Sequence, residues 1–159
     1  MPAKWIYLTS TLCLMMLPPP VLFTSASPLE SQAQGIVGQV VTLQGNFQPQ
    51  VGRLGKTGQV TPVQTRVWIF LGRIRVVPLS PRWPVAEAAQ HPQRWGWVAT
   101  DDQGWFRVGL PPGEYTLLAE SGPDLYLNDF LDDGSFMTVQ VQPGRITQVQ
   151  LENTEKAAF

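Results

Sequence analysis

Beyond residue 33, the chain is built from short apolar segments separated by clusters of glycine, proline, asparagine and aspartate. Within several segments apolar and polar residues alternate with a period of two, which is the pattern of a β-strand with one buried face. The segments that fit this pattern are 36–43, 65–70, 95–100, 105–110, 114–120, 136–142 and 146–151. We therefore expect an all-β fold, a two-sheet sandwich of seven antiparallel strands.

The alternation also assigns faces to the predicted strands. In the last two strands valine and leucine alternate with glutamine, which predicts a terminal hairpin turning at Pro143 and Gly144. Both faces of 36–43 carry apolar residues, which favours a central strand covered on both sides. Residues 65–70 also carry bulky apolar residues on both faces, so one of these faces must point outward or lie under a loop.

Two long connections interrupt the predicted strands, at 44–64 and 71–94. Loops of more than about 12 to 15 residues are uncommon and tend to be functional or disordered. Within the second connection, 84–90 predicts a short helix, with Pro84 at its first position. These two connections are where we expect functions particular to this chain.

Residues 1–33 have the organisation of a signal peptide. Lys4 precedes an apolar run over 5–17, and three consecutive prolines follow. Small residues satisfy the cleavage rule both after Ala26 and after Ala33, and both sites stay open. We disfavour a retained anchor, because a membrane-spanning helix needs about 20 uninterrupted apolar residues.

Export leaves residues 34–159 as one periplasmic or extracellular domain without a membrane span. Cys13 is the only cysteine and lies inside the apolar run, which argues against a lipoprotein signal. Its removal with the leader excludes disulfides, cysteine nucleophiles and cysteine-bound metals from the mature domain. Packing alone must then hold the domain together.

Charge is unevenly distributed although the net charge is only -1. Basic residues dominate 53–94, whereas acidic residues dominate 101–155. We expect the two halves to interleave and neutralise each other; the alternative is a basic loop face that docks on an anionic surface. Nucleic acid is not an expected partner for an exported chain without net positive charge.

The most specific motif covers residues 100–117, with the sequence TDDQGWFRVGLPPGEYTL. Its chemistry predicts a tight turn, in which the Asp101 carboxylate caps the turn and Gly104 adopts a positive φ. Strand pairing resumes at Trp105, and the LPPG sequence makes a second stiff turn.

This motif is similar to the signature of carboxypeptidase regulatory-like domains. These are transthyretin-like (prealbumin-like) β-sandwiches with a carbohydrate-binding-like fold, common in bacterial envelope proteins. Together with GIVGQV at 35–40 and the last two predicted strands, the resemblance covers most of the mature chain. It implies a fold, a seven-stranded antiparallel Greek-key β-sandwich of the prealbumin-like type. It does not imply an activity, because folds of this kind host many unrelated roles.

The residues needed for the reactions known in such folds are missing. A metallocarboxypeptidase site needs several histidine and glutamate ligands, and the transthyretin-like hydrolases that open hydroxyisourate use several histidines with a distinctive C-terminal tail. The only histidine is His91, which we interpret as an exposed loop residue, and 154–159 does not resemble that tail. A serine nucleophile would also need a base. We therefore expect no enzyme activity and no cofactor.

An acidic segment near the C-terminal third offers oxygen ligands. Asn128, Asp129, Asp132 and Asp133 are candidate calcium ligands. Their spacing matches no complete calcium loop, and the same residue types form ordinary turns. We favour the turn interpretation.

Tryptophans provide the candidate ligand-binding residues, namely Trp83, Trp95, Trp97 and Trp105. Trp95 and Trp97 share a strand face, and Trp105 begins the next strand, where its ring can lie near theirs. Trp83 lies in the adjoining connection. Flat rings can stack on sugars or peptides. The simpler interpretation, which we favour, is that two or three of them fill the core.

The sequence thus predicts a non-catalytic binding or scaffolding module. Carbohydrate is the first ligand to consider. The alternatives are a structural accessory domain that contacts another exported protein, and a calcium-stabilised module.

Overall fold

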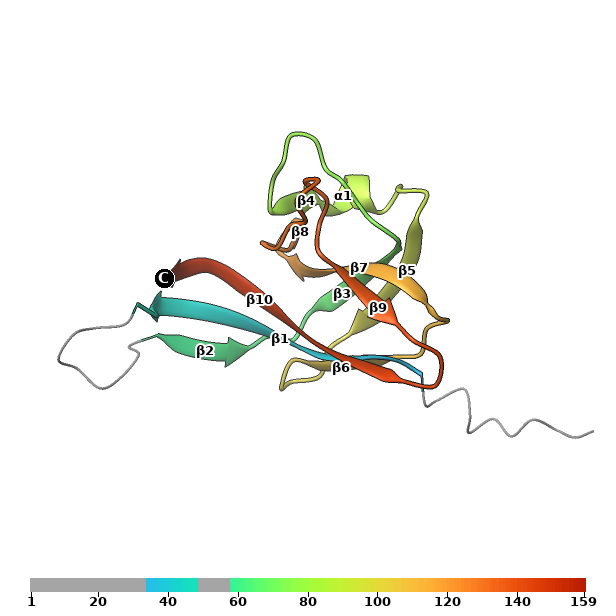
Figure 1. The fold of residues 1–159 in the computed structure, drawn as a ribbon. Coiled ribbons are helices and arrows are strands. Elements are labelled where there is room, and N and C mark those ends of the chain that lie inside the picture. The colour runs from blue at the N-terminus through green and yellow to red at the C-terminus, as the bar shows by residue number, and fades with distance from the viewer. Residues whose placement is uncertain (1–33, 49–57) are drawn as a thin grey trace, which may run out of the picture.

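A computed structural model describes residues 34–48 and 58–159; the segment predicted as a signal peptide lies outside them. The described chain is an all-β sandwich (Figure 1). Its elements are β1 (Gly35–Asn46), β2 (Gln59–Pro62), β3 (Arg66–Leu71), β4 (Arg82–Pro84), α1 (Val85–Ala88), β5 (Arg94–Ala99), β6 (Trp105–Val108), β7 (Gly113–Ser121), β8 (Asp124–Tyr126), β9 (Thr138–Val141) and β10 (Ile146–Ala158).

The strands form two sheets that face each other. Sheet A has the order β10-β1-β2, with β6 also paired to β1, and sheet B has the order β4-β8-β7-β3-β5, with β9 also paired to β7. Among the described residues, only β1 and β10 pair in parallel. β1 is the central strand of sheet A, as predicted.

All seven predicted segments form strands, but the described chain has three strands more than expected. β2 and β4 lie within the long connections, and β8 follows β7 directly. Each is only three or four residues long, so its apolar pattern was too short to identify from sequence. The predicted helix is confirmed as α1, although Pro84 occupies the position before its first residue.

The predicted terminal hairpin is wrong. β9 pairs with β7 in sheet B, whereas β10 pairs with β1 in sheet A. The turn at Pro143 and Gly144 therefore crosses between the sheets. Alternation shows which side chains of a strand face inward, but it carries no information about which strand lies alongside it.

The motif at 100–117 forms the predicted turn. The Asp101 carboxylate accepts hydrogen bonds from the backbone N–H groups of Gln103 (2.9 Å) and Trp105 (2.8 Å). Gly104 has φ +74°, and its carbonyl accepts a hydrogen bond from the Val40 N–H at 2.9 Å. This turn carries the chain from β5 of sheet B to β6 of sheet A, and the Gly104 bond attaches it to the central strand.

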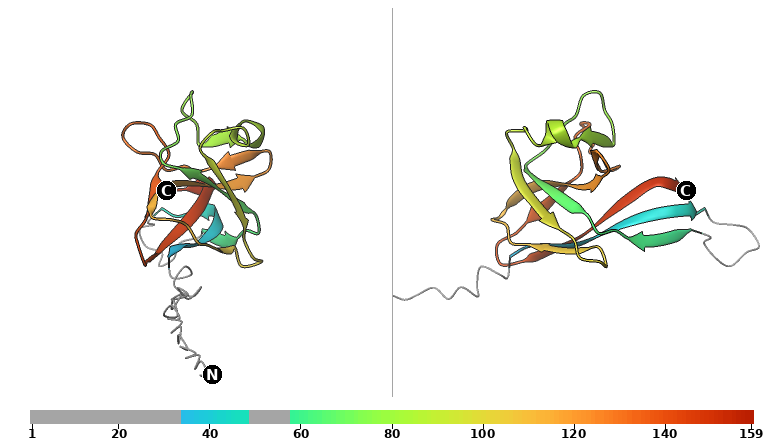
Figure 2. Two further views of the ribbon diagram at one scale, coloured as in Figure 1. Left: turned by 90° about the vertical axis from the view of Figure 1, so that its right-hand side faces the viewer. Right: turned by 180° about the vertical axis from the view of Figure 1, so that it is seen from behind.

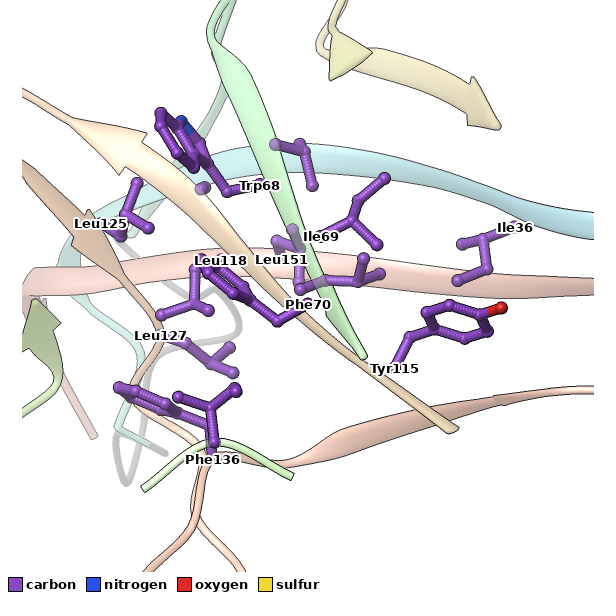
Figure 3. Close-up of a cluster of buried hydrophobic side chains, with 14 of the residues drawn as sticks. Ile36, Trp68, Ile69, Phe70, Tyr115, Leu118, Leu125, Leu127, Phe136 and Leu151 are labelled. Carbon is purple, nitrogen blue, oxygen red and sulfur yellow. The ribbon is translucent and has the colours of Figure 1, made fainter. Parts of the chain in front are cut away.

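Sheet B buries apolar side chains on both faces. Val67 and Ile69 pair with Ala119 and Leu117 of β7 and point toward sheet A. Phe70, next to Ile69 along β3, lies on the other face (Figure 3). That second face is covered by residues 71–94 together with 122–137, which include β4 and β8 at the edge of sheet B itself; we call these residues the cover. The side chains that the cover contributes to the core are Ile74, Trp83, Ala88, Leu125, Leu127 and Phe136. The expectation that one face of 65–70 lies under a loop is confirmed.

Salt bridges join the basic and acidic parts of the chain. Every salt bridge among the described residues connects an arginine between residues 66 and 82 to a carboxylate between residues 114 and 155. The pairs are Arg66–Glu120, Arg73–Glu114, Arg73–Asp133, Arg82–Asp124 and Arg82–Glu155. The prediction that the two halves interleave is confirmed.

Part of sheet A projects beyond sheet B. Residues 41–46 of β1, all of β2 and residues 152–158 of β10 form a three-stranded extension, which we call the arm, with the C-terminus at its end (Figure 2). Thr42 pairs with Asn153 and Gln44 pairs with Lys156, so β10 has one extra residue between these two pairs and forms a β-bulge. Near this bulge, Thr154 Oγ1 lies 3.1 Å from Tyr126 Oη, and Glu155 binds Arg82 through two contacts of 2.6 Å. The arm is therefore attached to the cover.

We expect Gly104→Ala to destabilise the protein more than Gly144→Ala does. Both glycines have a positive φ, which costs about 1–2 kcal/mol for any other residue. A Cβ at position 104 would in addition collide with the Val40 carbonyl oxygen, whereas a Cβ at position 144 meets no atom within 4 Å. Overpacking should add roughly 1–3 kcal/mol. Urea unfolding of both variants measures the difference, and equal losses would contradict the close approach to β1.

The pKa of Glu114 lies below its usual value, because the Thr138 hydroxyl donates a hydrogen bond to its carboxylate at 2.8 Å and Arg73 pairs with it. A lowered pKa stabilises the fold above the unfolded-state pKa of about 4.3, and this stabilisation is lost as pH falls through the folded-state value. We expect Thr138→Val to raise the pKa of Glu114 and to flatten the acid side of the stability profile. Carboxyl NMR titration and unfolding between pH 3 and 6 measure both effects.

Thr147→Val is the matched control, because the Thr147 hydroxyl bonds to the Gln140 carbonyl rather than to an acid. It should leave the Glu114 titration unchanged. A shift of equal size in both variants would mean that the hydroxyl of Thr138 does not set the pKa.

Candidate functional site

Three of the four candidate tryptophans are exposed. Trp95, Trp97 and Trp105 keep 45%, 50% and 48% of their surface open to solvent, whereas most large apolar side chains of the described chain are buried. The interpretation that these rings fill the core, which the sequence favoured, is wrong for all three. Strand position explains the difference, because β5 and β6 each lie at a sheet edge.

Trp95 and Trp97 lie on β5, the edge strand of sheet B; we call this surface the β5 edge. Ile69 pairs with Gly96 while Phe70 pairs with Arg94, so Trp95 is the extra residue of a β-bulge. A bulge disrupts strand pairing and turns side chains outward. Gly96, between the two rings, leaves open space where a Cβ would stand.

Trp97 is positioned by a charged network. The Arg66 guanidinium lies 5.4 Å from the centre of the Trp97 ring and pairs with Glu120 at 2.7 Å. The other oxygen of Glu120 accepts a hydrogen bond from the Trp68 indole N–H at 2.9 Å. Cation-π contacts of this kind contribute about 0.5–1 kcal/mol at exposed sites. The network restrains the ring, and sequence reasoning missed it because its members come from three strands.

Trp105 lies on a different surface. It pairs with Gln39, and Gln39 pairs in turn with Gln150, so these three side chains stand in a row on one face of sheet A. That face is opposite to the one from which Phe106 enters the core. We call it the sheet A face. Because Trp97 lies on the outer face of sheet B, the three exposed rings do not form one platform, contrary to the expectation that Trp105 would stand near the other two.

Trp83 does not belong to either surface. It is 5% exposed and packs against Phe70, with ring centres 5.1 Å apart. His91 lies edge-on to Trp83 at 5.2 Å and is half-buried, so the expected exposed loop histidine is instead part of the packing of the cover. Trp83 is therefore a core residue, and it also borders an open hollow of about 360 Å³ together with His91.

The four candidate calcium ligands are divided between two places. Asn128 and Asp129 line a hollow of about 210 Å³ together with Gln150, Glu152 and Thr154. Asp132 and Asp133 lie in the turn after Leu131.

The Asp133 carboxylate is already engaged within the protein. It accepts hydrogen bonds from the backbone N–H and the hydroxyl of Ser135, and it pairs with Arg73 at 3.3 Å. The Ser135 contacts lower the pKa of Asp133. This is the turn role that the sequence favoured. In the described ranges, no three histidine, cysteine or acidic side chains gather as a possible metal site.

A groove at the base of the arm was not predicted. Two adjoining hollows, of about 310 and 530 Å³, share Thr42, Val63, Ser121 and Asn153. The inner hollow lies between the two sheets, and the outer one lies between the arm and Arg82. We call the two together the arm groove. The signal available in the sequence was the change from apolar Val40 to polar Thr42 on the inward face of β1.

Comparison of the chain with protein-family models, with curated proteins and with solved structures finds no match. The resemblance of 100–117 to carboxypeptidase regulatory-like domains stays a prediction. Within residues 34–48 and 58–159, none of the helical structure has the length and apolarity that a membrane crossing requires.

Proposed function

We propose that this chain is an exported, non-catalytic binding module of the cell envelope, and that its ligand is a carbohydrate. The observation that carries the proposal is the exposure of Trp95, Trp97 and Trp105. Indole rings left in water on a rigid scaffold are suited to stacking on the apolar faces of sugar rings. Export follows from the predicted signal peptide over residues 1–33.

The sheet A face has the chemistry of a sugar-binding surface. Strands lie roughly 4.8 Å apart, so Gln39 and Gln150 place two amides within reach of a sugar stacked on Trp105. Gln39 is held in place because its side-chain amide donates a hydrogen bond to the Gln103 carbonyl at 2.9 Å. Amides both donate and accept hydrogen bonds, which matches hydroxyl groups.

The β5 edge offers a second contact for a sugar chain. Trp95 and Trp97 are two residues apart, roughly 6.6 Å along a strand. Their rings are accompanied by the Arg66 and Glu120 side chains, which supply charged hydrogen-bonding groups. Two separated aromatic surfaces would let one module bridge two chains of a polysaccharide.

The non-catalytic part of the proposal is supported by the lack of a suitably placed general base. His91 is the only imidazole in the chain, and its ring packs against Trp83 and Phe70. Its Nδ1 accepts a long hydrogen bond of 3.3 Å from the Gln93 N–H. In the described part of the chain, no serine or threonine hydroxyl is hydrogen-bonded to this ring, as a nucleophile that it activates would be.

We expect the purified chain to be retained by at least one of cellulose, chitin, starch and peptidoglycan, or by a glycan array. Each of Trp95→Ala, Trp97→Ala and Trp105→Ala should weaken binding about tenfold, because each removes one stacking surface. Pull-down and titration calorimetry measure the loss. Stability should change little, since each ring is about half exposed.

Met137→Ala is the matched control. Met137 is also exposed, but it adjoins β9, across sheet B from β5. Its truncation should leave binding unchanged. Failure of the folded wild type to bind any of these glycans would overturn the proposal.

The tip of the cover favours a second candidate, a structural accessory domain that contacts another envelope protein. Val77 and Leu79 are 82% and 61% exposed in the segment between β3 and β4. Two neighbouring apolar side chains at a loop tip are typical of a protein contact. Shortening the whole connection would be a poor test, because residues 71–94 also supply Ile74 and Trp83 to the core.

For this candidate, a photo-crosslinker at position 77 should give one defined adduct in cells of the source organism. The double variant Val77→Ser, Leu79→Ser, probed with the crosslinker at position 76, should lose that adduct without unfolding. A crosslinker at Trp95, distant from the tip along the sequence, is the control. An adduct that survives the double substitution would contradict this role.

A further inference from the structure

We infer that the arm groove is a binding site for an extended, uncharged peptide segment of a partner protein. This site is separate from the tryptophan surfaces and does not depend on them. Its walls are built by residues of β1, β2, β4, β7, β8 and β10 and by the segment 63–65. Four observations lead to this assignment.

The first observation is an array of polar side chains on the arm, which are amides or hydroxyls except for Lys156. Thr42 pairs with Thr61 of β2 and with Asn153 of β10, and Gln44 pairs with Gln59 and Lys156. Paired residues share a face of a sheet. All six of these side chains line the outer hollow, in two rows of three.

The second observation is that most of the array has no structural task; the exception is Asn153, which bonds to Ser121 and Glu155. No hydrogen bond is made by the side chains of Thr42, Gln44, Gln59 or Thr61 within the described part of the chain. Along β1 the inward positions are Ile36, Gly38 and Val40 where sheet B lies opposite, and they become polar where sheet B ends. Amides and hydroxyls both donate and accept hydrogen bonds, so these four side chains are suited to pairing with another polar surface.

The third observation is that the groove is pre-formed. Arg82 binds Glu155 on one side and Asp124 on the other, which holds the arm against β8 at a fixed separation. The contact between Tyr126 and Thr154 reinforces this attachment. A ligand therefore does not have to order the arm, and rigid sites lose less free energy on binding.

The fourth observation distinguishes a peptide from a sugar. Among the described residues that line the arm groove, Tyr126 alone is aromatic, and it is 4% exposed. Sugar rings thus have no surface to stack on. The inner hollow instead has an aliphatic floor of Val40, Val63, Ala119 and Leu151, which fits a small apolar side chain.

Spacing agrees with this choice. Thr42 and Gln44 are two residues apart on β1, roughly 6.7 Å, which is the distance after which an extended peptide repeats the same side. A peptide that runs along β1 would meet one row of the array with every second residue. The charged side chains that line the groove are Arg82, Lys156, Glu120, Glu152 and Glu155. Glu120 pairs with Arg66, so the other two acids and the two basic residues offset one another, and uncharged side chains are preferred along this wall.

The test is selection from a phage-displayed library of random twelve-residue peptides on the full-length chain. We expect enrichment of peptides with an uncharged, small-apolar pattern, and a synthetic copy of the most enriched one should bind the purified protein. In NMR spectra of the isotope-labelled chain, the side-chain NH₂ signals of Gln44, Gln59 and Asn153 should shift on its addition.

Variants locate the site. Thr61→Arg places a long cation over the outer hollow and should weaken binding of the synthetic peptide at least about tenfold. The double variant Gln44→Ala, Gln59→Ala removes one row without adding bulk, and should give a similar loss if Thr61→Arg does not fold. Val60→Arg is the matched control, because Val60 is the neighbouring residue of β2 on the opposite face and is 52% exposed.

Three results would overturn the inference. The first is that no peptide is enriched. The second is that a folded groove variant, either Thr61→Arg or the double variant, binds the peptide as well as the wild type does, and the third is that only Val60→Arg loses binding. Soluble hexasaccharides of glucose and N-acetylglucosamine form a second arm of the experiment. If they shift the Gln44 and Gln59 amides, the groove binds sugar and the inference fails. If the sugars shift only the tryptophan indole signals, the carbohydrate proposal is supported. The peptide-binding result then decides whether the arm groove binds a peptide.

Discussion

Strand β3 buries bulky side chains on both of its faces, and the rest of the architecture depends on this. Val67 and Ile69 need sheet A on one side, while Trp68 and Phe70 need cover on the other. Each such side chain contributes on the order of 1.5–3 kcal/mol when it leaves water. The connection 71–94 therefore folds back over sheet B instead of remaining a loop, and brings Trp83 and α1 with it. Sheet B is the middle layer of the molecule as well as half of the sandwich.

Because the core is concentrated around sheet B, sheet A is free to extend beyond it. β1 and β10 are long enough to build the sandwich with their first halves and the arm with their second halves. Where sheet B ends, the inward positions of β1 no longer have an apolar partner and carry threonine and glutamine. The bulge in β10 and the Arg82–Glu155 pair then fix the arm at an angle that leaves a groove. The groove is thus a consequence of two sheets of unequal length.

The two proposed binding regions differ in chemistry. The tryptophan surfaces lie at sheet edges and offer flat rings with amides or charges beside them, which matches sugars. The arm groove offers amides and hydroxyls around an aliphatic floor, which matches an extended peptide. A module with both would connect a polysaccharide to a protein, consistent with a scaffolding role in a cell envelope. Neither region requires a proton relay, and His91 is committed to the packing of the cover.

The sequence by itself determined the class of fold, the position of seven strands, the short helix and the geometry of the Asp101 turn. These follow from interactions between near neighbours, such as the period of two in a strand and the reach of a carboxylate over two to four residues. The separation of basic residues in 53–94 from acidic residues in 101–155 was also sufficient to predict that these two parts of the chain form salt bridges with each other.

Only the tertiary structure decided which strands lie side by side, and with that the location of every candidate site. Alternating valine and glutamine is compatible with a hairpin or with two separate sheets, so the separation of β9 from β10 could not be predicted. The exposure of Trp97 and the burial of Trp83 depend on which strand lies at an edge and which segment lies above the sheet. The arm groove needed the register of three strands, because its polar array is assembled from residues more than a hundred positions apart.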